Sequence, residues 1–208
     1  DGTLADGQHR LRAVVISGLT VRFLVFRGLE KKSGIAIDMH TQRSIHDALK
    51  IGGSPEWINK EVISVSRVLM GSMRKQRGVF SAGEVEEFAI KNSEPIKFAV
   101  SATARGKKTI STAPIVACYA CAYSAGEPEE MIRRFAEVMS TGEIDGPHEN
   151  SAIRLREWLM VNSQAGSGDS FRSSVVRRTM RAIYAFCRRT PLSKLIEPAD
   201  MIYRVPGE

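Results

Sequence analysis

The run Gly52-Gly53-Ser54-Pro55 divides the chain into two parts with different hydrophobic patterns. Glycine and proline clusters of this kind interrupt regular secondary structure, so a domain boundary is expected here. Before the run, residues 21–26 (Val-Arg-Phe-Leu-Val-Phe) predict a strand, whereas helical spacing of apolar residues predominates after it. The sequence therefore predicts an α+β fold, with a mixed module over residues 1–52 and an all-helical domain over residues 55–208.

Capping residues and apolar spacing predict where the helices begin and end. Ser81-Ala82-Gly83-Glu84 is a capping box, and Pro114 suits the first turn of a helix that ends at Gly126. Trp57, Val62, Val65, Val68 and Leu69 are expected in the core. The other predicted helices cover residues 10–17, 41–50, 56–70, 95–104, 129–139, 150–160 and 170–189.

Composition is typical of a globular protein, with 43% hydrophobic and 25% charged residues in 208. No apolar run approaches the roughly 18 residues needed to span a bilayer, so no membrane association and a cytoplasmic location are expected. The three cysteines agree with a reducing compartment. Cys118 and Cys121 form a C-x-x-C pair, but they share one face of a predicted helix and no second pair completes a zinc site, which favours buried core residues.

The segment Asp6-Gly7-Gln8-His9-Arg10-Leu11-Arg12-Ala13 has the features of a phosphate-binding turn. Glycine lets the backbone approach an anion, and the first N–H groups of the following helix point toward it. An arginine adds a planar fork that binds phosphate oxygens in pairs. Asp6 is a candidate to hold a metal ion, to orient His9 or to cap the turn.

These residues resemble the glycine-arginine box of the ParB/sulfiredoxin superfamily. The resemblance implies that Gly7, Gln8, His9, Arg10 and Arg12 surround the phosphates of a nucleotide, CTP or ATP. A second similarity lies at Asp38-Met39-His40-Thr41-Gln42-Arg43, where Gln42 and Arg43 match a further box of the ParB proteins. The resemblance covers about residues 1 to 52 and implies that strands upstream of Asp1 belong to the same module.

Two departures from the family pattern bear on the chemistry. Gln8 takes the place of the sulfiredoxin cysteine, and without a thiol nucleophile the sulfinic-phosphoryl reaction is excluded. Met39 stands where the ParB box has a glutamate, and a thioether does not bind Mg²⁺. Asp38 is then the candidate to replace that carboxylate, and Asp6 and Asp38 are the candidate catalytic carboxylates, as a base or a metal ligand, if the protein is an enzyme. Mg²⁺ is a candidate cofactor beside the nucleotide.

The net charge of +7 is concentrated toward the end of the chain. Arg177 and Arg181 are one helical turn apart, and an apolar face of the same predicted helix carries Val176, Met180 and Ile183. One interpretation is contact with the phosphates of DNA, and the other is pairing with acidic neighbours such as Glu197 or Asp200. The candidate nucleic-acid-binding residues are Arg177, Arg178, Arg181, Arg188 and Arg189.

The helical part lacks a convincing helix-turn-helix, so the resemblance to chromosome-partition proteins is limited to the boxes. Leu155-Arg156-Glu157-Trp158-Leu159 and the Pro114 helix instead resemble short ParB-like proteins of bacteriophages and actinobacteria. Two functions follow as hypotheses. One is a DNA-associated protein that binds a nucleotide or phosphate at the box, with a homodimer as its candidate assembly. The other is a nucleotide-dependent enzyme of the same superfamily, either an NTPase, a phosphotransferase or a nuclease.

Overall fold

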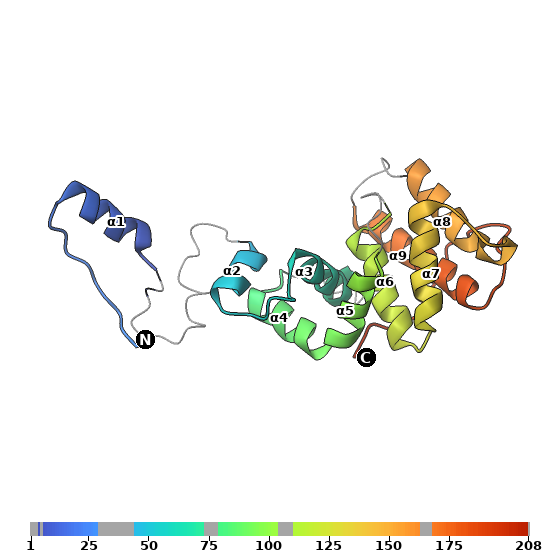
Figure 1. The fold of residues 1–208 in the computed structure, drawn as a ribbon, viewed down its shortest axis with the longest axis horizontal. Coiled ribbons are helices and arrows are strands. Elements are labelled where there is room, and N and C mark those ends of the chain that lie inside the picture. Colours follow the sequence, from blue (N-terminus) through green and yellow to red (C-terminus); the bar gives the residue numbers. More distant parts are fainter. Residues whose placement is uncertain are drawn as a thin grey trace.

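The computed structural model describes residues 4, 6–28, 44–72, 79–103, 110–162 and 168–207. In these ranges every regular element is helical (Figure 1). A π-helical turn, η2 (Val68–Ser72), follows α3, and a 3₁₀ turn, η3 (Pro147–Glu149), precedes α8. The α-helices are α1 (Gln8–Ser17), α2 (Ile45–Ile51), α3 (Lys60–Arg67), α4 (Ala82–Lys91), α5 (Ser93–Ala102), α6 (Ala113–Ser124), α7 (Glu129–Thr141), α8 (Asn150–Asn162) and α9 (Asp169–Cys187).

The predicted α+β class is wrong for the described residues, which contain no strand. Residues 21–26, the predicted strand, have no regular secondary structure and are exposed, with Leu24 at 83% of its full accessibility. A strand needs a neighbouring strand to accept and donate its backbone hydrogen bonds. None of the described segments supplies that neighbour, so the alternating pattern is present without the sheet that it predicts.

Helix α6 lies at the centre of the helical body because it is apolar on every side. All its residues from Ile115 to Ala122 are buried, which is the pattern of a helix surrounded by other helices. It packs against α5 and α9, and it also contacts α3 and α7 (Figure 1). Tyr119 meets Phe135 of α7 edge to face, with the ring centres 6.1 Å apart. None of the described helices combines the length and apolar character needed to cross a bilayer.

The predicted caps account for several helix starts. Ser81 and Glu84 form the capping box at α4, where the Ser81 amide donates to the Glu84 carboxylate at 2.7 Å. Helix α3 begins at Lys60, later than predicted, because Asn59 accepts hydrogen bonds from the amides of Glu61 and Val62. Val62, Val65 and Leu69 are buried as expected, whereas Trp57 and Val68 are partly buried at the edge of the core.

Helix α1 differs from the other helices in its surroundings. It buries none of its residues, and Val15 and Ile16 are about four-fifths exposed, at 81% and 78%. In Figure 1 the α1 segment stands apart from α2 to α9, with no other described element packed on it. The apolar side chains of residues 11–26 therefore add nothing to the core of the helical body.

The segment after α9 has no regular secondary structure but is closely attached to the helices. Leu192, Tyr203 and Val205 are buried. The Asn150 side chain accepts from the Leu192 amide at 2.8 Å and donates to its carbonyl at 3.1 Å. The segment is thus attached to α8 through Asn150, to α9 through Glu197, which pairs with Arg177, and to Glu127 before α7 through the Tyr203 hydroxyl.

Candidate functional site

The predicted phosphate-binding turn is open and exposed. Gly7 has φ 90° and ψ 9°, a left-handed conformation that favours glycine, and α1 begins directly after it. The Leu11 amide donates to the Gly7 carbonyl at 2.9 Å, which closes the first turn. Gly7 has no side chain to cap this helix end, and among the described residues none accepts from the amides of residues 8–10, which leaves them to an external acceptor. No described side chain fills the space beside Gly7.

Arg10 folds back toward the start of the turn and pairs with Asp6. Its Nη2 lies 2.8 Å from Asp6 Oδ2, and the side chains are 69% and 28% exposed. Asp6 forms an ion pair with the box arginine, and its three predicted roles, toward a metal ion, His9 and the turn, stay predictions. Gln8, His9 and Arg12 are exposed around the same helix end. The guanidinium thus stays next to the turn, with its charge partly balanced.

The second group of candidate residues has no structural description. Asp38, Gln42 and Arg43 lie outside the described residues. The structure therefore brings Asp6 and Arg10 together at the turn that Gly7 forms. The predicted approach of the two boxes stays a prediction.

The arginines of α9 are engaged by the segment that follows the helix. Glu197 accepts from Arg177 in a very short contact, from Ser174 at 2.5 Å, and lies 3.5 Å from Arg178. Arg178 Nη1 also donates to the Leu195 carbonyl at 2.5 Å, and its guanidinium lies over the Trp158 ring. At these two positions the structure shows the acidic pairing that the sequence offered as the alternative to DNA contact.

The remaining arginines of this set divide into two kinds. Arg188 pairs with Glu127 at 2.7 Å and covers the Tyr184 ring at 3.5 Å. Arg189 is exposed in a left-handed conformation with φ 52°, and Arg181 is partly exposed on α9. Within the described residues, no carboxylate pairs with Arg181 or Arg189. Of the five candidate arginines, Arg181 and Arg189 are therefore the two that no carboxylate of the described residues holds.

The C-x-x-C cysteines are core residues, as predicted. Cys118 and Cys121 are fully buried in α6, and burial raises the pKa of the Cys118 thiol well above its ordinary value. Cys118 Sγ lies 3.1 Å from the Pro114 carbonyl and 3.6 Å from the Val176 carbonyl. Their helix contacts α9 through this face, so the pair serves helix packing. In the described parts of the chain, no three histidine, cysteine or acidic side chains gather as metal ligands would.

No known protein family, curated protein or solved structure matches this chain. The resemblance to the ParB/sulfiredoxin boxes therefore rests on the residues quoted for it.

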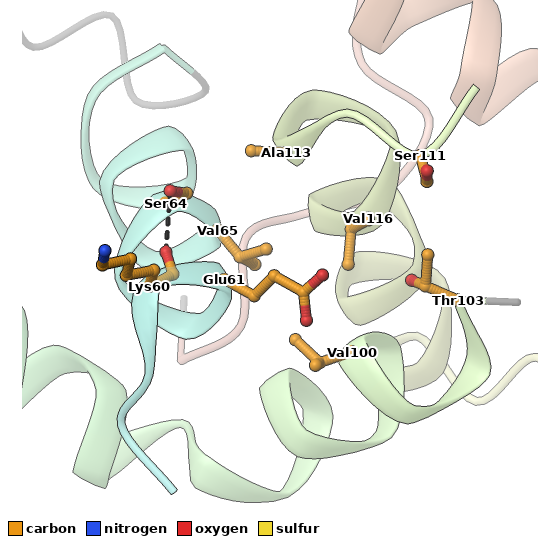
Figure 2. A pocket seen from close by; sticks show the side chains of 9 residues that line it. All are labelled: Lys60, Glu61, Ser64, Val65, Val100, Thr103, Ser111, Ala113 and Val116. Carbon is orange, nitrogen blue, oxygen red and sulfur yellow. Dashed lines mark hydrogen bonds between the residues drawn. The ribbon is translucent and has the colours of Figure 1, made fainter. Parts of the chain in front are cut away.

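A cavity that the sequence did not predict lies between α3, α5 and α6 (Figure 2). Its volume is about 270 Å³. Glu61 and Ser64 line it from α3, Val100 and Thr103 from the end of α5, and Val116 from α6. The lining residues come from helices that are distant in the sequence, so no motif of consecutive residues could have indicated the cavity.

Proposed function

We propose that the chain is a nucleotide-binding, DNA-associated protein in which the turn around Gly7 holds the nucleotide phosphates. The observation that carries the proposal is the start of α1, where Gly7 supplies no cap and no side chain in the described part of the chain accepts from the first amides. Backbone N–H groups and the positive end of a helix favour an anion at that place. Residues 7–12 resemble the ParB/sulfiredoxin box, and this resemblance supports phosphate as the anion.

In this proposal Arg10 supplies the charged contact and Asp6 competes for it. The two side chains are already paired at 2.8 Å without a ligand. A phosphate that takes the Arg10 guanidinium must break or share this exposed ion pair, which costs up to about 1 kcal/mol. If Mg²⁺ accompanies the nucleotide, the released Asp6 carboxylate can bind the ion and recover that cost. We place this activity in the cytoplasm, where nucleotides are available.

The test is a calorimetric titration of the full chain with CTP and with ATP, each with and without Mg²⁺. Arg10→Ala is expected to weaken binding by at least about tenfold, because it removes a charge-assisted, two-pronged contact. Arg22→Ala is the matched control, since it removes the same charge from the exposed segment after α1. Asp6→Asn is expected to tighten binding without Mg²⁺ and to abolish any gain from adding it.

Two outcomes would contradict the proposal. One is the absence of saturable binding of either nucleotide to the full chain. The other is an equal loss in the Arg10 and Arg22 variants, since this would indicate general attraction to a basic protein rather than a site at the turn.

DNA contact is the second part of the proposal, and it rests on Arg181 and Arg189, the two candidate arginines that no carboxylate of the described residues pairs with. Arg181 and Arg189 lie at and beyond the last turns of the helix. Each contact to a DNA phosphate releases about 0.9 counterion, so both together give a salt slope near −2. Arg177, Arg178 and Arg188 are excluded from this count because they already bind carboxylates.

Binding of a short DNA duplex at several salt concentrations tests this second part. Loss of both guanidinium groups (Arg181→Ala with Arg189→Ala) is expected to remove most of the slope. Arg154→Ala, which removes an arginine paired with Glu157 at 3.3 Å, is expected to change it little. An unchanged slope in the double variant would refute contact through α9. The same titrations, followed by assay of released phosphate, also test the enzymatic alternative, which predicts turnover that Asp6→Asn abolishes.

A further inference from the structure

The cavity between α3, α5 and α6 has an apolar floor. Val65 and Val116 belong to the core, at 1% and 6% exposure, and Val100 packs beside them from α5. The volume of about 270 Å³ lies just below the roughly 300–1,000 Å³ of pockets for drug-sized ligands. The cavity is therefore suited to a short aliphatic chain rather than to a nucleotide.

Two of the hydroxyl groups that line the cavity, those of Ser64 and Thr103, can act only as acceptors toward a ligand. The Ser64 hydroxyl donates its proton to the Lys60 carbonyl at 2.8 Å, and the Thr103 hydroxyl donates to the Ala99 carbonyl at 2.9 Å. A hydroxyl has a single proton, so both oxygens offer only lone pairs to a ligand. A ligand that matches them must itself be a donor.

Glu61 adds a negative charge at the same place. In Figure 2 its carboxylate extends over the valine side chains, whereas the ammonium group of the neighbouring Lys60 points away. Other acidic residues of the helical body, such as Glu127 and Glu149, are paired with arginine. Among the described residues, no cation pairs with Glu61 and no side chain donates to it.

We propose that this cavity binds an alkylammonium group, with Glu61 as its counter-ion. The ammonium pairs with the Glu61 carboxylate, and a further N–H group is directed to a hydroxyl oxygen on one side of it, Ser64 or Thr103 (Figure 2). The alkyl chain lies on Val65, Val100 and Val116. Such a group can belong to a free amine or to a lysine side chain. The proposal is independent of the phosphate-binding turn, which lies on α1.

The test follows the methyl signals of Val65, Val100 and Val116 by NMR in the full chain at low ionic strength. The probes are n-butylammonium, 1-butanol and butyrate, which share a chain and differ in charge. Butylammonium is expected to shift the three valines with a saturable, millimolar affinity, and butyrate to leave them unchanged. A lysine blocked at both ends distinguishes the sources: binding at least as tight as that of butylammonium assigns the cation to a protein side chain, and exclusion assigns it to a free amine.

Glu61→Gln is expected to weaken butylammonium binding about fivefold, the effect of one partly exposed charge pair, and to leave butanol binding unchanged. Glu87→Gln is the matched control, because Glu87 is an exposed glutamate on α4, away from the cavity lining. The proposal is overturned if butanol shifts the valines as strongly as butylammonium does. It is also overturned if the Glu87 variant weakens binding as much as the Glu61 variant.

Discussion

Removal of the Glu197 side chain tests whether the last segment of the chain is part of the stable fold. Glu197 is 24% exposed, and its partners Arg177 and Arg178 are 31% and 21% exposed, so solvent screens these contacts only in part. A charge-assisted hydrogen bond contributes about 1.5–3 kcal/mol when desolvated and less than 1 at the surface. The contact to Ser174 at 2.5 Å adds to the same carboxylate. We expect Glu197→Ala to lower the free energy of unfolding by about 2 kcal/mol.

A thermal melt measures this loss. In a domain of this size, 1 kcal/mol corresponds to about 2–4 °C, so the midpoint should fall by about 4–8 °C. Asp200→Ala is the control, since Asp200 is exposed in the same segment and no described cation pairs with it. An unchanged midpoint for Glu197→Ala, or an equal fall for Asp200→Ala, would refute the assignment. The same variant frees Arg177 and Arg178, so its DNA salt slope should steepen by up to about 2.

Three further variants or treatments have defined outcomes. Arg134 lowers the pKa of the buried Glu149 from its usual 4.5. The carboxylate therefore stabilises the fold above that pH, and this contribution is lost as the pH falls through the lowered value. Urea melts should show that Glu149→Gln lowers the free energy of unfolding at pH 7 and that this loss becomes smaller in acid. Ser81→Ala should cost about 1 kcal/mol in the same melts, because it removes the cap that pairs with Glu84. Burial raises the pKa of Cys118, so mass spectrometry should find its thiol unalkylated at pH 8 until the protein is unfolded.

The helical part was predictable because its signals are local. A capping box needs only Ser81 and Glu84, and the helix that carries Pro114 begins at Ala113, within one residue of its prediction. Cys118 and Cys121 were predicted as core residues because they share one face of a helix, and the structure confirms that they are buried. Such signals act within one or two turns, so the sequence contains all that they require.

The strand and the basic face depend on contacts that no local pattern specifies. Residues 21–26 alternate partly as a strand would, but strand formation is decided by a second segment, and the described residues provide none. Arg177 and Arg181 do lie on one helix, yet Arg177 is held by Glu197 from a segment beyond the helix end. Helical spacing predicts where the arginines lie on α9, whereas the segment after the helix, which folds back against it, supplies their partners. From the sequence alone, Glu197 and DNA phosphates were both candidate partners of Arg177. Only the fold shows that Glu197 binds it.

Several arginines bind acceptors within the protein, and this changes what the net charge of +7 implies about binding to other molecules. Arg134 binds the Glu149 carboxylate, and Arg156 caps the end of α7 through the carbonyls of Met139 and Ser140. These side chains act as internal connectors, because one guanidinium can satisfy several acceptors that would otherwise be left unpaired at helix ends. A basic composition here is therefore partly a consequence of how the helices are joined. Among the five candidate arginines, the proposed DNA contact is therefore assigned to Arg181 and Arg189, because the carboxylates of the described residues already hold the other three.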